Sequence, residues 1–203
     1  NRRARMLLPL IYLIRHGLNE EVDLSGDILI IDSFPVPVCQ PIRNRRAKIF
    51  RGYADISYKA TKKIYYYGFK VHAIVSDDGY LLDYIVTKAS VHDAKETVEL
   101  ITNAHPDNRY LLGDEGYLGK NLHQRLEQMG YTLWTPYRKN MKNAQKHNKH
   151  YLMALRRTIE SDFSLLSYYN AENNRARSLA DFQERLEVAI LAYNMAYCLE
   201  RFN

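Results

Sequence analysis

Three acidic residues of this sequence stand where carboxylates could do chemistry: Asp32, Asp114 and Glu160. Asp32 follows an apolar run, Asp114 lies in a glycine-containing segment, and Glu160 falls at the edge of a helical apolar stripe. A charge in a central strand needs a partner or a metal ion. Carboxylate oxygens suit Mg²⁺, and two such ions can activate an attacking oxygen and stabilise a leaving one. Together the three acids predict a site for two Mg²⁺ ions, for which Mn²⁺ can substitute.

Each acid taken alone also has an ordinary structural explanation. Asp32 could cap the turn after its strand, and Asp114 could form an Asx-turn. Glu160 could simply pair with Arg156, four residues earlier on the same helix. Glu115 competes with Asp114, but alternation along a strand directs neighbouring side chains to opposite faces. Only the combination of all three acids among basic segments favours catalysis.

The elements that must position these acids follow from apolar periodicity and turn residues. The sequence predicts strands at 27–34, 63–76, 80–88, 110–114 and 131–135. It predicts helices at 1–17, 93–103, 118–129, 149–166 and 179–199. Pro35, Pro37 and Pro41 are expected to end the first strand and open a long basic loop, and Asp93 to begin its helix in a cap with His92. This order predicts an α/β fold: a five-stranded mixed sheet with helices on both faces.

Basic residues gather in two segments of a chain whose formal net charge is +6 and whose pI is about 9.2. Residues 43–70 hold nine Lys or Arg and one acid, and residues 137–157 hold seven and no acid. Cationic groups neutralise phosphates, and the accompanying tyrosines can stack on unpaired bases. We expect phosphate contacts from Lys70, His72, Arg138, Lys139 and Lys142. For Lys70 and His72 a solvated sheet face is the alternative.

Several other kinds of protein and site are not indicated. There is no run of about 18 uncharged apolar residues, so no membrane partner is expected. Cys39 and Cys198 form no spaced motif, which favours a reduced, cytoplasmic protein. His147 and His150 lack further ligands at the spacing of a zinc site.

Four segments carry a resemblance to a known family. They are Ile30-Ile31-Asp32-Ser33, Tyr67-Gly68-Phe69-Lys70-Val71-His72, Gly113-Asp114-Glu115-Gly116-Tyr117 and Arg157-Thr158-Ile159-Glu160-Ser161-Asp162-Phe163. In this order they resemble the DDE-type transposases of bacterial insertion sequences across residues 27–199. The resemblance implies a ribonuclease H-like fold, double-stranded DNA as the partner, and metal-dependent DNA cleavage and strand transfer. It also implies that Asp32, Asp114 and Glu160 are the metal ligands.

The resemblance extends to the surroundings of the acids. Many relatives carry a Tyr–Arg–Glu–Lys signature around the last acid; Arg156 and Glu160 match it, whereas Met153 and Ser167 depart from it. Arg156 is therefore expected to contact DNA. Relatives also carry an N-terminal DNA-binding region, so residues 1–26 are expected to be a helical segment and linker left from it. Residues 27–203 would form the catalytic domain, acting as a homodimer on DNA at the bacterial nucleoid. The alternatives are a structure-selective nuclease of the same fold and a non-catalytic DNA-binding remnant.

Overall fold

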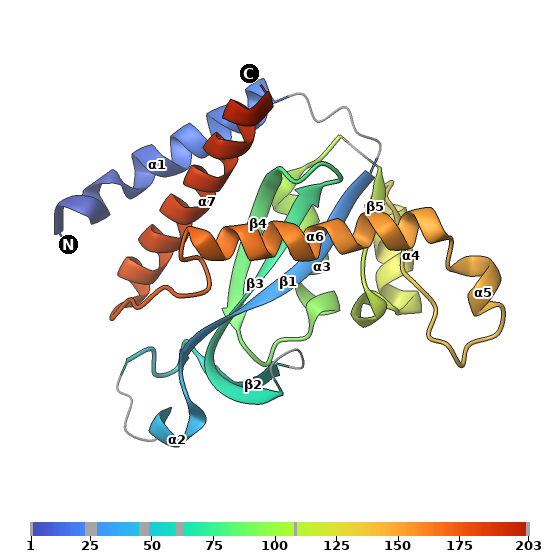
Figure 1. Ribbon diagram of the computed structural model, residues 1–203, viewed down its shortest axis with the longest axis horizontal. Helices are drawn as coiled ribbons and strands as arrows, with labels where there is room; N and C mark the ends of the chain where they lie inside the picture. Colours follow the sequence, from blue (N-terminus) through green and yellow to red (C-terminus); the bar gives the residue numbers. More distant parts are fainter. Residues whose placement is uncertain (1, 23–27, 45–48, 60–62, 108, 202–203) are drawn as a thin grey trace.

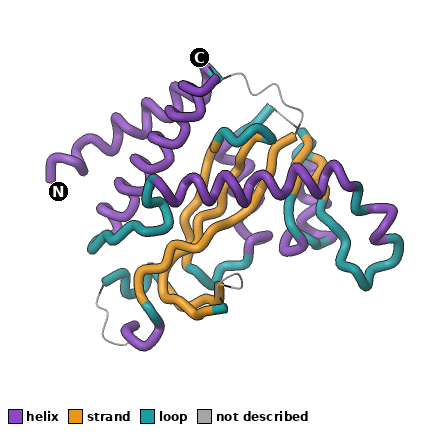
Figure 2. The backbone as a smooth tube through the Cα atoms, in the orientation of Figure 1, coloured by secondary structure: helices purple, strands orange, loops and turns teal. Residues whose placement is uncertain are grey.

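A mixed β-sheet carries helices on both of its faces (Figures 1 and 2). The computed structural model describes residues 2–22, 28–44, 49–59, 63–107 and 109–201. The strands are β1 (Ile28–Cys39), β2 (Asp55–Lys59), β3 (Ile64–Ser76), β4 (Leu81–Lys88), β5 (Tyr110–Leu112) and β6 (Thr132–Trp134). The helices are α1 (Arg2–Glu21), α2 (Pro41–Asn44), α3 (Asp93–Ala104), the 3-10 helix η2 (Glu115–Tyr117), α4 (Lys120–Gln128), α5 (Ala144–His147), α6 (His150–Tyr168) and α7 (Leu179–Arg201).

The strand order places β1 in the middle of the sheet: β2-β3-β1-β5-β6, with β4 also paired to β3. β3 is antiparallel to β1 on one edge, and to β2 and then β4 on the other. β5 runs parallel to β1, and β6 runs parallel to β5. Antiparallel strands therefore come first and alternating helices and strands follow. This confirms the α/β class and the mixed sheet expected from the sequence.

The first strand is longer than predicted. β1 continues through Pro35 and Pro37 to Cys39, so the expectation that these prolines end the strand is wrong. Only Pro41 lies beyond it, as the first residue of α2, a position that needs no N–H donor. Proline is tolerated in a strand that has one unpaired edge. β1 pairs with β5 only over residues 28–30, so its later part has β3 as its ladder partner.

The sheet also gains a strand within the segment predicted as a basic loop. β2 pairs antiparallel with the beginning of β3, and the described sheet has six strands where five were predicted. Residues 45–48 and 60–62 of this basic segment lie outside the described residues. So do residues 23–27, which include part of the predicted linker and the predicted start of the first strand.

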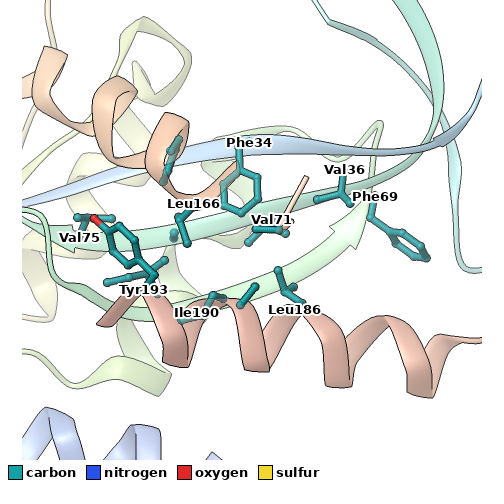
Figure 3. Packing of buried hydrophobic residues seen from close by; sticks show 14 of the residues in the cluster. Phe34, Val36, Phe69, Val71, Val75, Leu166, Leu186, Ile190 and Tyr193 are labelled. Carbon is teal, nitrogen blue, oxygen red and sulfur yellow. The ribbon is translucent and has the colours of Figure 1, made fainter. Parts of the chain in front are cut away.

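Alternation along β1 divides the core between the two faces of the sheet. Ile30 and Phe34 belong to the cluster formed with α6 and α7, which Figure 3 shows with Leu166 and Ile190. Residues 29 and 31 belong instead to a second cluster, formed with α3 and α4. The apolar run of β1 is thus buried on both faces, as expected for a central strand.

A buried arginine fastens α1 to the rest of the domain. Arg15 is 1% exposed, and its Nε donates to Oε1 of Glu187 on α7 at 2.6 Å. Its Nη2 lies 3.2 Å from Oδ1 of Asp83 on β4, and the Tyr84 hydroxyl also donates to Glu187. Burial alone would lower the pKa of Arg15, but the two carboxylates raise it above its ordinary value. Neither α1 nor any other helix in the described part of the chain combines the length and apolar character needed to cross a membrane.

Candidate active site

Asp32 lies on the face of β1 that packs against α6. Its side chain is 18% exposed, and Nη1 of Arg156 lies 3.9 Å from its Oδ2. The backbone N–H of Ser33 donates to its Oδ1 at 2.7 Å. Burial is the main reason why the pKa of Asp32 is raised to about 7. Repulsion from Asp114 and Asp93 acts in the same direction, whereas the Ser33 N–H and the charge of Arg156 lower the pKa. The charged form of Asp32 is therefore less favourable than that of a solvent-exposed aspartate.

Asp114 follows β5, the parallel neighbour of β1. Its Oδ1 accepts a hydrogen bond of 2.7 Å from the N–H of Gly116 and caps η2. The Asx-turn considered as the alternative is thus present, but it uses one oxygen only, so it is compatible with a role as a ligand. Burial raises the pKa of Asp114, and its charge in turn raises the pKa of Asp32. The structure therefore brings two of the three predicted acids within electrostatic reach of each other.

The two glycines around Asp114 leave room for this arrangement. A Cβ on Gly113 would lie 3.0 Å from the Tyr117 side chain, which is only 2% exposed. A Cβ on Gly116 would lie 2.8 Å from Oδ1 of Asp114 and 3.5 Å from Oδ2 of Asp93. Both glycines thus serve close packing beside the carboxylates.

α6 carries the third predicted acid. The backbone of Glu160 lies on this helix, four residues after Arg156, and its side chain lies outside what the structure describes. Figure 1 shows α6 crossing over β1. The ring of Phe163 lies 4.9 Å from that of Phe34 on β1. The helix therefore passes over the strand that carries Asp32, and position 160 is about one turn from the arginine that faces this carboxylate.

A further aspartate lies beside the pair. Asp93, expected to act in a helix cap, is the first residue of α3, and the cap is His92, whose Nδ1 accepts from the N–H of Ala94. Oδ1 of Asp93 accepts hydrogen bonds from Ser33 Oγ at 2.7 Å and from Lys70 Nζ at 3.1 Å. Sequence reasoning assigned Asp93 to the cap alone and missed its place beside the acids.

Lys70 and His72 share one face of β3, as predicted, and both approach Asp93. Nδ1 of His72 lies 3.7 Å from Oδ1 of Asp93, and its Nε2 hydrogen-bonds to Thr87 Oγ1 at 2.9 Å. His72 is 1% exposed, which contradicts the solvated face for this residue. Burial lowers the pKa of His72 to about 4 and keeps the ring neutral. Contact of Lys70 and His72 with DNA phosphates stays a prediction.

The basic loop after β6 lies beside the acidic pair. Arg138 and Glu115 are both more than half exposed, and Nε of Arg138 lies 3.9 Å from Oε2 of Glu115. Glu115 thus faces the loop, in agreement with its lower rank as a ligand. Lys139 and Lys142 on the same loop are exposed.

Stacked rings hold this loop in place. The imidazole of His147 lies between Tyr137, at 3.6 Å, and Trp134, at 5.4 Å between ring centroids. Its Nε2 hydrogen-bonds to the carbonyl of Thr135 at 2.8 Å. The Asn148 side chain accepts from the N–H of Tyr137 and donates to its carbonyl. His147 therefore packs against Tyr137 and Trp134 and binds a backbone carbonyl.

The donor chemistry of the acidic pair suits a hard divalent cation. Among the side chains that the structure describes, no group of three or more His, Cys, Asp or Glu could hold a metal ion. The Glu160 carboxylate is outside this set of side chains. Asp32 and Asp114 supply oxygen atoms only, which fits Mg²⁺ or Mn²⁺ and not softer metals. A cation between them would relieve the repulsion that raises the pKa of Asp32.

One family model matches most of this chain. The family model described as "Transposase DDE domain" matches residues 23–195, and the chain therefore belongs to that family. It is accordingly a DNA transposase domain, and its enzymatic class is that of the DDE transposases. The match covers β1, which carries Asp32, the turn after β5 that holds Asp114, and the helix that carries Glu160. No curated protein sequence matches this chain.

Solved structures of one transposase are distantly similar. The catalytic domain of Mos1 mariner transposase has 11% identity and a TM-score of 0.35, and the match covers 97% of this chain and 94% of that one. Its paired-end complex with Mn has 10% identity, and its paired-end complex with the left transposon end has 12%. Both also have a TM-score of 0.35, and this chain covers 62% of the protein in those complexes. The family assignment rests on the sequence match.

Proposed function

We propose that this chain cuts and joins DNA at a two-metal site formed by Asp32, Asp114 and Glu160. The observation that carries the proposal is the position of Asp32 on β1 and of Asp114 directly after β5, its parallel neighbour, where burial raises the pKa of both carboxyls and other carboxylates lie near each. Acids held in this unfavourable state gather at functional sites. Glu160 is assigned as the third ligand from the family motif and from its place on the helix over β1.

The residues of the chain orient the proposed ligands. The N–H of Ser33 holds one oxygen of Asp32, and the N–H of Gly116 holds one oxygen of Asp114. Bound there, two Mg²⁺ ions, or Mn²⁺ in their place, would activate water and then a 3′-hydroxyl for attack on a phosphodiester and stabilise the leaving oxygen. Arg156 faces Asp32 and is proposed to turn to a DNA phosphate when the acids hold metal.

The proposed DNA path runs from the acids over the basic loop. Arg138, Lys139 and Lys142 carry exposed cations next to Glu115, the residue after Asp114. These groups would bind the backbones of element ends and of target DNA without reading sequence. We further propose that residues 27–203 act as the catalytic domain, with 1–26 as a helical segment and linker whose helix α1 packs on α7, in a homodimer on DNA at the bacterial nucleoid.

Replacement of each acid by its amide tests the proposal. Asp32→Asn, Asp114→Asn and Glu160→Gln should each abolish cleavage of labelled DNA in Mg²⁺ or Mn²⁺, because an amide keeps the shape but loses the charge that holds the cation. DNA binding should stay largely intact, and pairs of replacements should cost little more than one. Glu115→Gln is the matched control and should cut almost normally. A Glu160→Gln protein with wild-type cleavage would remove Glu160 from the site.

A joining assay separates a transposase from the alternative, a nuclease of the same fold. The wild-type protein should transfer a cut 3′ end into a second, supercoiled DNA. Hydrolysis without any joined product, under conditions where the ends are cut, would favour the nuclease.

A further inference from the structure

The carboxylate of Asp93 connects three elements behind the proposed metal ligands. Its Oδ1 accepts a hydrogen bond from Ser33 on β1 at 2.7 Å and one from Lys70 on β3 at 3.1 Å. Its Oδ2 lies 3.5 Å from the point where a Cβ on Gly116 would stand, beside the Asp114 turn. Asp93 therefore contacts the two strands and borders the turn at the place where the acids meet.

Ser33 transmits this contact to Asp32. Successive side chains of a strand point to opposite faces, so Ser33 faces α3 while Asp32 faces α6. The Ser33 hydroxyl donates to Asp93, and the Ser33 backbone N–H donates to Oδ1 of Asp32. Asp93, on the α3 side of the sheet, thus holds the Ser33 side chain, and the Ser33 peptide N–H holds the Asp32 carboxylate on the α6 side.

Lys70 holds Asp93 in this position. Its Nζ donates to the carbonyl of Val91 at 2.8 Å as well as to Asp93, so the ammonium is fixed at two points. His72, whose ring is buried and neutral, turns its otherwise unpaired Nδ1 toward the same carboxylate at 3.7 Å. The ion pair offsets the charge of Asp93, so that Asp93 can lie near Asp32 and Asp114 at a reduced cost in repulsion.

We propose that Asp93 is a positioning residue of the transposase: through Ser33 it sets the orientation of the Asp32 carboxylate, and Lys70 holds Asp93 in place. The inference rests on the proposed role of Asp32 as a metal ligand. Groups that orient metal-binding side chains typically change metal affinity or activity by roughly 10–100-fold when they are replaced. A mere fold-stabilising pair would leave the affinity of the folded protein for metal unchanged.

Mn²⁺ binding to the DNA-free protein, measured by the electron paramagnetic resonance of free Mn²⁺, tests the inference without an activity assay. Asp93→Asn should weaken Mn²⁺ binding by roughly tenfold or more while the protein stays folded and binds DNA. Ser33→Ala should have a similar effect, the double variant should be no worse than either, and Ser33→Thr should restore binding because it returns the hydroxyl. The matched control is Glu99→Gln, a charge removed from the exposed side of α3.

The outcomes separate this inference from the proposed function. Wild-type Mn²⁺ affinity in Asp93→Asn, or losses of Asp93→Asn and Ser33→Ala that add in the double variant, would overturn the positioning role. If Asp93→Asn does not fold, the Mn²⁺ affinity of Ser33→Ala tests the positioning role by itself: wild-type affinity in this variant would overturn it. Asp32→Asn is the reference: if it binds Mn²⁺ and cuts DNA normally, the proposed function fails; if it loses both while Asp93→Asn loses neither, only the positioning role fails.

Discussion

Burial shifts the pKa values of two residues of the site, Asp32 and His72, away from their ordinary values. Asp32 has a pKa of about 7 because it is largely withdrawn from solvent, so near neutral pH the metal-free carboxyl binds a proton readily. His72 is the opposite case: burial lowers its pKa to about 4 and the ring stays neutral. Both shifts disfavour the charged form of the group, and strongly shifted pKa values are common at functional sites.

Because the neutral ring of His72 is buried, we expect it to contribute to the loss of folding stability at acid pH. Its folded pKa of about 4 is below the ordinary 6.5, so its contribution to stability is complete above pH 6.5 and is lost as the pH falls toward 4. His72→Gln cannot titrate. Urea unfolding at pH 7 and pH 4.5 should therefore show a smaller acid loss in this variant than in the wild type, by on the order of 2 kcal/mol.

The control for this prediction is His150→Gln, because His150 is exposed and its replacement should not change the acid loss. Equal pH dependence of the wild type and His72→Gln would show that another group dominates.

Asp32 and Asp114 could be identified from the sequence because each has a local signal. Asp32 is the charged residue at the end of an apolar run, and Asp114 lies between Gly113 and Gly116. Asp93 could not be placed in this way, since its partners Ser33 and Lys70 are far away in the chain. The available signal was an acid in the first turn of the helix that follows the third predicted strand, and a cap explained that acid equally well. The contacts of Asp93 with Ser33 and Lys70 show that it lies beside the proposed site and does not act in the helix cap alone.

At the scale of elements, the sheet edge shows where local sequence is insufficient. Pro35 and Pro37 lie inside β1, because the later part of this strand has its ladder partner on one side. β2 forms because the beginning of β3 offers an edge to pair with. Residue propensities do not show which strand edge is free, so the length of β1 and the presence of β2 were not predictable. The alternation along the strands and the longer helices α1, α3, α4, α6 and α7 were predicted, whereas the short helices α2, η2 and α5 were not.

The contact of α1 with β4 and α7 includes a buried cation, Arg15, beside the hydrogen bonds of Asn19 with Leu82 and Tyr80. Arg15→Met would leave Glu187 buried with the Tyr84 hydroxyl but without its cationic partner, and breaking such an ion pair typically costs about 3–5 kcal/mol. We expect a loss of this order in urea unfolding. Adding Glu187→Gln should recover part of it, because the uncompensated charge is then removed.

Arg125→Met, on the exposed face of α4, serves as the surface control and should change stability by less than about 0.5 kcal/mol. A loss in Arg15→Met no greater than in this control would mean that the Arg15–Glu187 pair does not stabilise the contact of α1.

At the scale of the molecule, the charges are divided: carboxylates gather at the sheet, and exposed cations lie on the loop beside them. Reversing Arg138, Lys139 and Lys142 to Glu should lower affinity for all DNA sequences alike. It should also flatten the dependence of binding on salt, by about one unit of slope for each phosphate that the loop no longer neutralises. Titration of labelled duplexes at several salt concentrations measures both quantities.

The matched control reverses Lys95, Lys120 and Arg125, which are exposed on α3 and α4 and give the same change in net charge. Equal losses of affinity in the two triple variants would mean that net charge, and not the loop, determines binding.

The opposite orientations of Asp32 and Ser33 on β1 restrict insertions and deletions in this strand. Because Asp32 belongs to the layer of α6 and Ser33 to the layer of α3, inserting or deleting one residue within 29–32 would exchange the two sides. The carboxylate would then be presented to the wrong layer, and no rotation of its side chain could return it. Substitutions along this strand can be absorbed by repacking, whereas a shift of its register by one position cannot, so the length of this short stretch is under tighter constraint than the identity of its apolar residues.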